Sequence, residues 1–197
     1  MATISVVLDI AFVCTGNRYR SVLAAAAFRA AVEGLPVRVG SFGTLDVGSA
    51  GPLPEALEAA RGFGLDISGH SARCVVDADL SDTSLVVGFE RSHSAAAIRA
   101  GARPERTFTL LELVELLGRV GAVSEAEPVA RALELIGRAD ALRASEPSLV
   151  EIADPIGQSR SRQEAIGRQV YAATTKLTEQ LFGSVPDYVA RARTGGG

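Results

Sequence analysis

Residues 8–21 read LDIAFVCTGNRYRS, the most informative run in the chain. Its apolar, β-branched first half ends at Cys14, a short Gly-Asn turn follows, and an alanine-rich segment begins directly after Ser21. The pattern predicts a strand, a tight loop and a helix N-terminus in immediate succession. Because such a loop turns its backbone N–H groups inward and the helix end adds partial positive charge, we expect it to bind an anion.

Two side chains near the ends of this loop indicate what the anion would meet. Arg20 carries a planar guanidinium that can hold two oxygens of a phosphate at once. A cationic loop and a helix N-terminus favour the thiolate form of Cys14, a nucleophile able to attack a bound phosphorus atom. Ser21 could hydrogen-bond the sulfur and make it a better leaving group. The alternative is a buried structural cysteine with a solvated arginine nearby.

The run VCTGNRYRS (13–21) resembles the phosphate loop of low-molecular-weight protein tyrosine phosphatases and of the arsenate reductases that share their fold. The resemblance extends over about residues 6–117 and 149–183. It implies that Cys14 is the nucleophile and that Arg20 clamps the phosphate. It also implies that the loop as a whole binds phosphate, through Thr15, Gly16, Asn17, Arg18, Tyr19, Arg20 and Ser21.

The pair Asp154-Pro155 follows an apolar segment and precedes a helix predicted near residues 161–181. Taken alone, an Asp-Pro pair is ordinary turn chemistry. Together with the loop, it resembles the acid loop of the same family. The resemblance implies that Asp154 protonates the leaving oxygen and then acts as base toward the water that cleaves the cysteinyl phosphate.

Two further residues match the family by position. Ser41 lies in the segment GSFGT, and His70 lies in the segment DISGHSAR. The resemblance implies that both hydrogen-bond Asn17 and, with Ser21, hold the shape of the loop. His93 follows an apolar strand, and we expect it to begin a helix rather than to line the site.

Composition limits the class of protein. The 197 residues are 47% hydrophobic with a formal net charge of −3, which fits one domain and gives no general attraction to nucleic acid or anionic membranes. Two cysteines are too few for a secreted disulfide framework. The N-terminal segment lacks a basic region, and no run reaches 18 apolar residues, so we expect neither a signal peptide nor a membrane span. These features predict a cytoplasmic protein.

Strand-like and helix-like segments alternate along the chain. Strands are predicted near residues 37–43, 84–89 and 106–109, and helices near residues 21–33, 54–63, 92–100 and 110–117. The alternation predicts an α/β fold with a doubly wound, mainly parallel sheet flanked by helices. We assign residues 1–190 to a single phosphatase-like domain and expect a disordered tail at 191–197.

Residues 119–148 are predicted to be a helical insertion before the acid loop, because the family's chain is shorter there. Apolar residues recur at helical spacing from about residue 127 to residue 143, and Glu134 and Arg138 form an i,i+4 pair. This helix could form a lid or a specificity wall over the site. It could equally be a packing helix, within the monomer or in a homodimer.

The sequence thus predicts a cysteine-dependent phosphomonoester hydrolase, and most directly a protein tyrosine phosphatase. Its partners would be a phosphorylated protein or a small phosphomonoester, with inorganic phosphate as product and with no cofactor or metal. Two departures from the family stand out: Tyr19 replaces the second loop cysteine of many members, and Ile156 follows Asp154-Pro155 without the usual aromatic residue. The alternatives are an arsenate reductase coupled to a small thiol and a phospho-binding module with reduced turnover.

Overall fold

A four-stranded parallel sheet forms the centre of the protein. The computed structural model describes residues 7–121, 123–143 and 150–183. Within them the sheet has the order β2-β1-β3-β4. Its strands are β1 (Leu8–Cys14), β2 (Val37–Gly43), β3 (Leu85–Gly88) and β4 (Thr107–Thr109). This arrangement confirms the predicted α/β fold with a parallel, doubly wound sheet.

The register of the strands brings the ends of β1, β2 and β3 together. Cys14 at the end of β1 is paired with Gly43 at the end of β2, and Val13 is paired with Gly88 at the end of β3. Because the strands are parallel, the segments that follow them leave the sheet at the same edge. This edge therefore collects residues that are far apart in the sequence.

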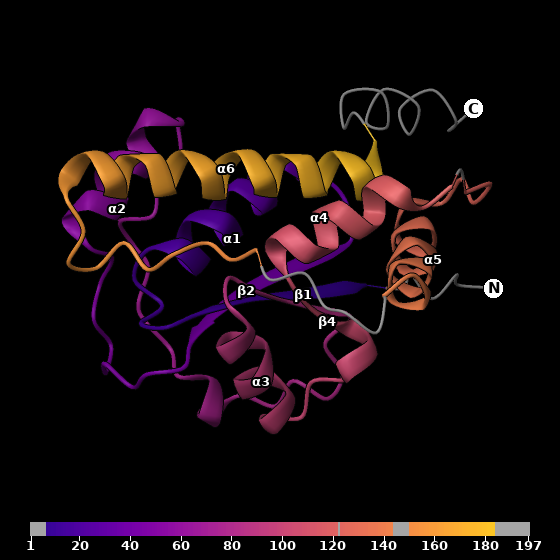
Figure 1. Cartoon of the computed structure of the whole chain (residues 1–197), viewed down its shortest axis with the longest axis horizontal. Coiled ribbons are helices and arrows are strands. Elements are labelled where there is room, and N and C mark those ends of the chain that lie inside the picture. Colours follow the sequence, from indigo (N-terminus) through magenta and orange to yellow (C-terminus); the bar gives the residue numbers. More distant parts are fainter. Residues whose placement is uncertain (1–6, 122, 144–149, 184–197) are drawn as a thin grey trace.

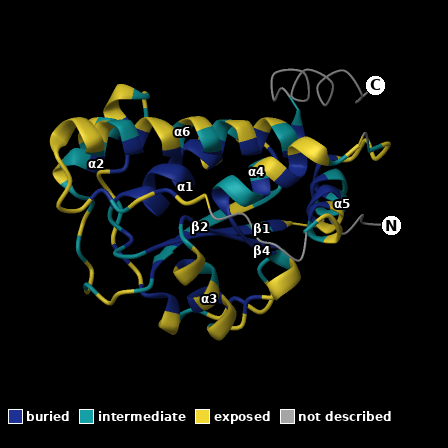
Figure 2. Cartoon of the chain, in the orientation of Figure 1, coloured by how far each residue is buried: buried dark blue, intermediate teal, exposed yellow. Residues whose placement is uncertain are grey.

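Helices cover both faces of the sheet (Figure 1). One face carries α1 (Arg20–Ala31), α4 (Leu110–Arg119) and the long α6 (Arg160–Phe182), with α2 (Pro54–Gly62) packed beside them. The other face carries α3 (Arg91–Arg99). Figure 2 shows the sheet buried between these layers, with the exposed side of α6 turned outward. Among the described helices, none combines the length and the apolar character that a membrane span requires.

Aromatic packing joins β1 to the helical layer above it. The rings of Phe12 on β1 and Phe28 on α1 lie 5.7 Å apart, and Phe28 lies 6.1 Å from Phe182 at the end of α6. All three side chains are buried. The position of α1, and with it the loop at its N-terminus, is therefore fixed by the core.

The predicted insertion contains α5 (Pro128–Ala141), close to the expected span of 127–143. Its apolar face is buried against α4 and α6. Arg143, just beyond the helix, donates to the carbonyl oxygens of Pro104 and Thr107 at the start of β4. This is the edge of the sheet opposite Cys14, so α5 packs into the core and does not cover the 14–21 loop (Figure 1). The predicted tail at 191–197 and the insertion residues 144–148 lie outside the described residues.

Candidate active site

The loop between β1 and α1 carries backbone N–H groups that the rest of the described backbone does not use. Cys14 ends β1, and Arg20 begins α1. Within the described residues, no backbone carbonyl accepts a hydrogen bond from the N–H groups of residues 16–19. Unpaired N–H groups at the N-terminus of a helix favour an anion.

Asn17 holds the loop from inside. Its φ is 51°, in the left-handed region that residues other than glycine adopt at a cost. Its buried amide nitrogen donates to the hydroxyls of Ser21 and Ser41 (both 2.9 Å), and its amide oxygen accepts from the backbone N–H of Arg73 (2.9 Å). Its carbonyl oxygen accepts from Nε2 of His70 at 2.8 Å. The structure thus places Ser41 and His70 against Asn17.

The tautomer of His70 follows from this contact. A carbonyl oxygen can only accept, so Nε2 carries the proton. Burial is the main cause that lowers the pKa of His70 below its ordinary value. The hydrogen bond to Asn17 opposes that shift, whereas the charges of Arg73 and Arg29 add to it.

Gly43 allows β2 to end directly beneath the loop. A Cβ atom at this position would lie 2.9 Å from the carbonyl oxygen of Thr15 and 2.9 Å from the backbone nitrogen of Asn17. Both neighbours are backbone atoms and cannot swing away. Any other residue at Gly43 would therefore displace the loop, which the sequence pattern alone did not reveal.

Cys14 and Ser21 face each other across the base of the loop. The sulfur lies 3.0 Å from the Ser21 hydroxyl, and both side chains are buried. When the sulfur is ionised, it can only accept, so Ser21 is then the donor. Asn17, which donates to the oxygen of Ser21, helps to turn the hydroxyl proton toward the sulfur.

Arg20 brings three segments together, although its side chain is only 1% exposed. One guanidinium nitrogen, Nη1, contacts the carboxylate of Glu90 and the carbonyl oxygen of Ile152 (2.8 Å). The other, Nη2, donates to Oγ1 of Thr15 (3.0 Å) and to Oδ2 of Asp154 (2.6 Å). The acid loop, defined here as residues 152–158, is therefore attached to the 14–21 loop through Arg20.

Glu90 is a site residue that the sequence reasoning missed. It follows β3, whose neighbour in the sheet is β1, and so it emerges beside the 14–21 loop. Its place two residues after an apolar strand was the available signal. Without the order of the strands, that signal does not identify Arg20 as its partner.

His93 does more than begin a helix. It occupies the third position of α3, where its side chain and that of Glu90 form reciprocal capping contacts with the backbone. Its side chain is buried, and Nε2 lies 3.2 Å from Oγ1 of Thr15, so it also touches the loop. Burial, followed by the charge of Arg20, lowers the pKa of His93 to about 4.

Arg18 and Tyr19 are turned away from the centre of the loop. Nε of Arg18 donates to the carbonyl oxygen of Gly51 at 2.7 Å. The Tyr19 hydroxyl donates to the carbonyl oxygen of Gln163 on α6 at 2.9 Å. Burial is the main cause that raises the pKa of Tyr19 to about 12. These side chains fasten the loop to its surroundings and leave the backbone N–H groups of residues 18 and 19 as their contribution to an anion site.

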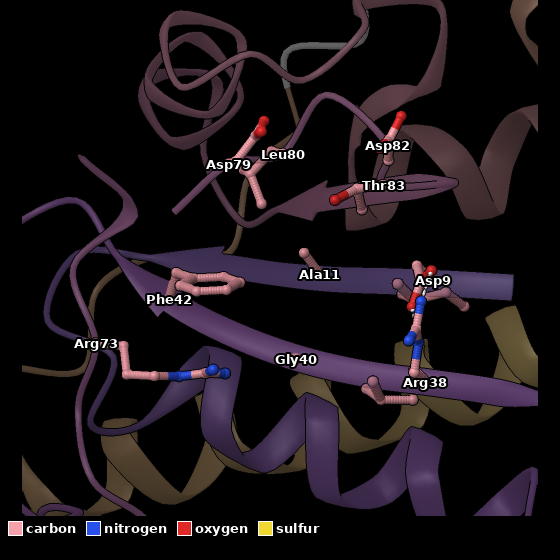
Figure 3. A pocket seen from close by; sticks show the side chains of 12 residues that line it. Asp9, Ala11, Arg38, Gly40, Phe42, Arg73, Asp79, Leu80, Asp82 and Thr83 are labelled. Atoms are coloured by element: carbon pink, nitrogen blue, oxygen red, sulfur yellow. Dashed lines mark hydrogen bonds and ion pairs between the residues drawn. The ribbon is translucent and has the colours of Figure 1, made fainter. Parts of the chain in front are cut away.

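A separate cavity of about 390 Å³ lies on the side of the sheet that carries α3 (Figure 3). The ion pair of Asp9 and Arg38 stands at one end, and the guanidinium of Arg73 lies over the ring of Phe42 at the other, 4.5 Å from its centroid. Cys14 does not line this cavity. Within the described residues, no group of three or more His, Cys, Asp or Glu side chains is arranged to hold a metal ion.

Comparisons with known protein sequences point to one family. The family described as "Low molecular weight phosphotyrosine protein phosphatase" matches residues 9–125. A low molecular weight protein-tyrosine-phosphatase of Streptomyces coelicolor is 38% identical over 112 residues, which cover 53% of this chain and 66% of the relative.

Solved structures show the same fold. The arginine phosphatase YwlE matches with a TM-score of 0.65 and 24% identity, over 88% of this chain and 95% of its own. A low molecular weight protein tyrosine phosphatase from T. tengcongensis matches with a TM-score of 0.63 and 23% identity, over 88% of this chain and 99% of its own. At these identities the likeness concerns the fold alone.

Proposed function

The chain belongs to the low molecular weight phosphotyrosine protein phosphatase family, and from that premise we propose that it hydrolyses phosphomonoesters through a cysteinyl phosphate on Cys14. One observation carries the proposal. Arg20 contacts both the Thr15 hydroxyl, next to the nucleophile, and Asp154, the proposed acid. A nucleophile, a phosphate clamp and an acid are thereby held around one loop.

In the first half-reaction the sulfur of Cys14 attacks phosphorus and the bond from phosphorus to the leaving oxygen breaks. Protonated Asp154 gives its proton to that oxygen, so the product leaves as an alcohol or phenol. The unpaired N–H groups of residues 16–19 and the guanidinium of Arg20 hold the phosphate oxygens. For this, Nη2 of Arg20 must exchange its contact with Asp154 for one with the phosphate.

In the second half-reaction water attacks the cysteinyl phosphate. Asp154, now ionised, takes a proton from the water, and the bond between sulfur and phosphorus breaks. The electron pair of that bond returns to the sulfur of Cys14. Ser21, 3.0 Å from the sulfur, stabilises the departing thiolate by donating a hydrogen bond.

We propose phosphotyrosine in proteins as the natural substrate class, which the description of the family supports. Leu45, whose backbone N–H bonds to the carbonyl oxygen of Thr15, is 57% exposed. Ile156, which follows the acid loop's proline, is 59% exposed. Two exposed aliphatic side chains beside the loop can pack against the faces of a tyrosine ring. A reactive thiolate further suits a reducing compartment, which supports a cytoplasmic location.

The test measures hydrolysis of p-nitrophenyl phosphate and of matched phosphotyrosine, phosphoserine and phosphoarginine peptides. We expect activity on the aryl esters and its loss, by more than about 100-fold, in Cys14→Ser. Cys74→Ser is the matched control and should keep its activity, because Cys74 is a free, buried cysteine outside the loop. Persisting turnover in Cys14→Ser would exclude the nucleophile. Arsenate-dependent consumption of a small thiol, without ester hydrolysis, would favour the reductase instead.

A further inference from the structure

Besides Arg20, the hydroxyl of Thr15 joins the 14–21 loop to the acid loop. Oγ1 of Thr15 lies 3.2 Å from Nε2 of His93, 3.0 Å from Nη2 of Arg20 and 2.9 Å from Oδ2 of Asp154. The proposed mechanism leaves two of these residues, Thr15 and His93, without a role. The direction of each hydrogen bond can be assigned by counting donors and acceptors.

The contacts of His93 show which of its ring nitrogens carries the proton. Its Nδ1 receives the backbone N–H of Glu90 at 3.1 Å and lies 3.4 Å from the backbone nitrogen of Phe89. A ring nitrogen that accepts from N–H groups carries no proton, so the neutral ring has its proton on Nε2. The lowered pKa of about 4 agrees with a neutral ring at physiological pH. Nε2–H therefore donates to Thr15.

The neighbours of Thr15 determine where its hydroxyl proton points. A hydroxyl has two acceptor positions and one proton. His93 and Arg20 each donate to the oxygen, which fills both acceptor positions. The proton must then point to the third neighbour, the carboxylate of Asp154.

We propose that Thr15 and His93 are positioning residues that keep Asp154 on the 14–21 loop while Arg20 turns to the phosphate. The inference rests on the proposed function. Within the described residues, Asp154 accepts hydrogen bonds from Arg20, from Thr15 and from the backbone N–H of Ile156 in its own loop. Once Nη2 of Arg20 exchanges Asp154 for a phosphate oxygen, Nη1 still holds the Ile152 carbonyl oxygen, but among the described contacts only Thr15 then holds the Asp154 carboxylate on the 14–21 loop.

The hydrogen bonds to Asp154 also favour one protonation state of its carboxyl group. Thr15 donates to Oδ2 of Asp154, and the N–H of Ile156 donates to Oδ1 at 2.9 Å, so both oxygens act as acceptors. This arrangement suits the ionised carboxylate, which is the form that takes a proton from water in the second half-reaction. Losing the network should therefore slow cleavage of the cysteinyl phosphate more than its formation.

The first experiment replaces Thr15 and follows p-nitrophenyl phosphate hydrolysis by stopped flow. Thr15→Val keeps the shape of the side chain without the hydroxyl, and we expect kcat to fall about 10-fold with a burst of about one p-nitrophenol per active site. The inhibition constant of inorganic phosphate should change by less than about threefold. Thr15→Ser restores the hydroxyl and should stay within about threefold of the wild-type kcat.

The second experiment separates positioning from helix capping at His93. In His93→Asn the amide oxygen takes the place of Nδ1, which keeps the contact with the Glu90 N–H but cannot reach Thr15. In His93→Gln the amide nitrogen takes the place of Nε2, which keeps the donor to Thr15. We expect kcat to fall about 10-fold in His93→Asn and to stay within about threefold of wild type in His93→Gln. If His93 only capped α3, the result would be reversed: kcat would fall in His93→Gln and stay near wild type in His93→Asn.

A buried hydroxyl elsewhere provides the control. Thr178 on α6 donates to the carbonyl oxygen of Thr174, away from both loops, and Thr178→Val should keep the wild-type kcat. If Thr15→Val and His93→Asn both stay within twofold of wild type while Cys14→Ser is inactive, the positioning role is overturned and the proposed function stands. If Cys14→Ser remains active, the proposed function itself fails.

Discussion

Arg20 and Asp154 are 134 residues apart in the sequence, and their side chains form an ion pair with 2.6 Å between Nη2 and Oδ2. Arg20 is almost completely buried, whereas the Asp154 side chain is 33% exposed. The proposed phosphate clamp and the proposed acid therefore compensate each other's charge within the structure. In the proposed mechanism Arg20 must leave this ion pair to bind phosphate, and Asp154 must leave it to donate a proton. The two residues should therefore be tested together.

Asp154→Asn tests the acid role. It removes the proton donor but keeps a side chain of the same shape, so we expect kcat for a phosphotyrosine peptide to fall by about 10²–10⁴-fold. Phosphate should bind at least as well as in wild type, because Arg20 then loses a competing carboxylate. The measurement is steady-state kinetics with inorganic phosphate as inhibitor. A loss of less than about threefold would remove Asp154 from the mechanism.

Glu90→Gln tests the other carboxylate on Arg20. The substitution keeps the side-chain shape and leaves the buried guanidinium with one negative partner fewer. Breaking a fully buried ion pair costs about 3–5 kcal/mol, and because Glu90 is 29% exposed we expect about 1–3 kcal/mol less free energy of unfolding. Urea denaturation measures this directly.

The matched control for Glu90 is Glu134→Gln. Glu134 forms an exposed i,i+4 pair with Arg138 on α5, and such pairs contribute about 0.3–0.5 kcal/mol. The two variants carry the same chemical change and differ in the burial of the arginine. If both substitutions lowered the free energy of unfolding equally, the ion pair of the buried Arg20 with Glu90 would contribute no more than an exposed pair.

Gly43→Ala tests the contact between β2 and the loop. The added methyl group would lie 2.9 Å from two backbone atoms of the loop, so we expect about 1–3 kcal/mol of destabilisation and weaker binding of vanadate. Gly137→Ala is the control, because a Cβ there meets nothing within 4 Å and lies inside α5. That substitution should stabilise the protein by about 0.5–1 kcal/mol. An unchanged affinity for vanadate in Gly43→Ala would contradict the proposed packing.

The parts of the site that were predictable from the sequence are the local ones. The strand, loop and helix around Cys14 follow from a continuous run in which an apolar segment, a turn and an alanine-rich segment succeed one another. The parallel sheet follows from the alternation of strands and helices, and the helix α5 follows from its apolar spacing. In each case neighbours in sequence decide the structure.

The parts that were missed depend on neighbours in space. Glu90 and His93 reach the loop because β3 lies beside β1, and no local pattern states the order of strands in a sheet. The same holds for α5: its periodicity shows that one face is buried but not that α4 and α6 cover it. His93 lies in the first turn of α3, as expected, but the expectation that it would not line the site was wrong, because its Nε2 contacts Thr15.

The lowered pKa of His93 predicts how stability depends on pH. Its pKa is about 4 in the folded protein and near the ordinary value of 6.5 in the unfolded chain. Burial is the largest cause of the shift, the charge of Arg20 lowers the pKa further, and the charges of Glu90, Asp154 and Glu151 raise it. Between pH 6.5 and about 4 the unfolded chain therefore binds a proton that the folded protein does not.

The free energy of unfolding should accordingly fall as the pH is lowered through this window, with no contribution from His93 above it. His93→Gln removes the titrating group and leaves the surrounding carboxylates in place, so the difference between variant and wild type isolates one residue. We expect the wild type to lose up to about 3 kcal/mol relative to the variant between pH 7 and pH 4, measured by urea denaturation at each pH. Both proteins keep Asp154, Glu90 and Glu151, so a constant difference across the window would mean that folding does not lower the pKa of His93 and that its ring is protonated there in the folded protein as well. A protonated ring would still donate from Nε2 to Thr15, but its Nδ1 could no longer accept from the backbone N–H of Glu90, and the assigned contacts of His93 would be wrong.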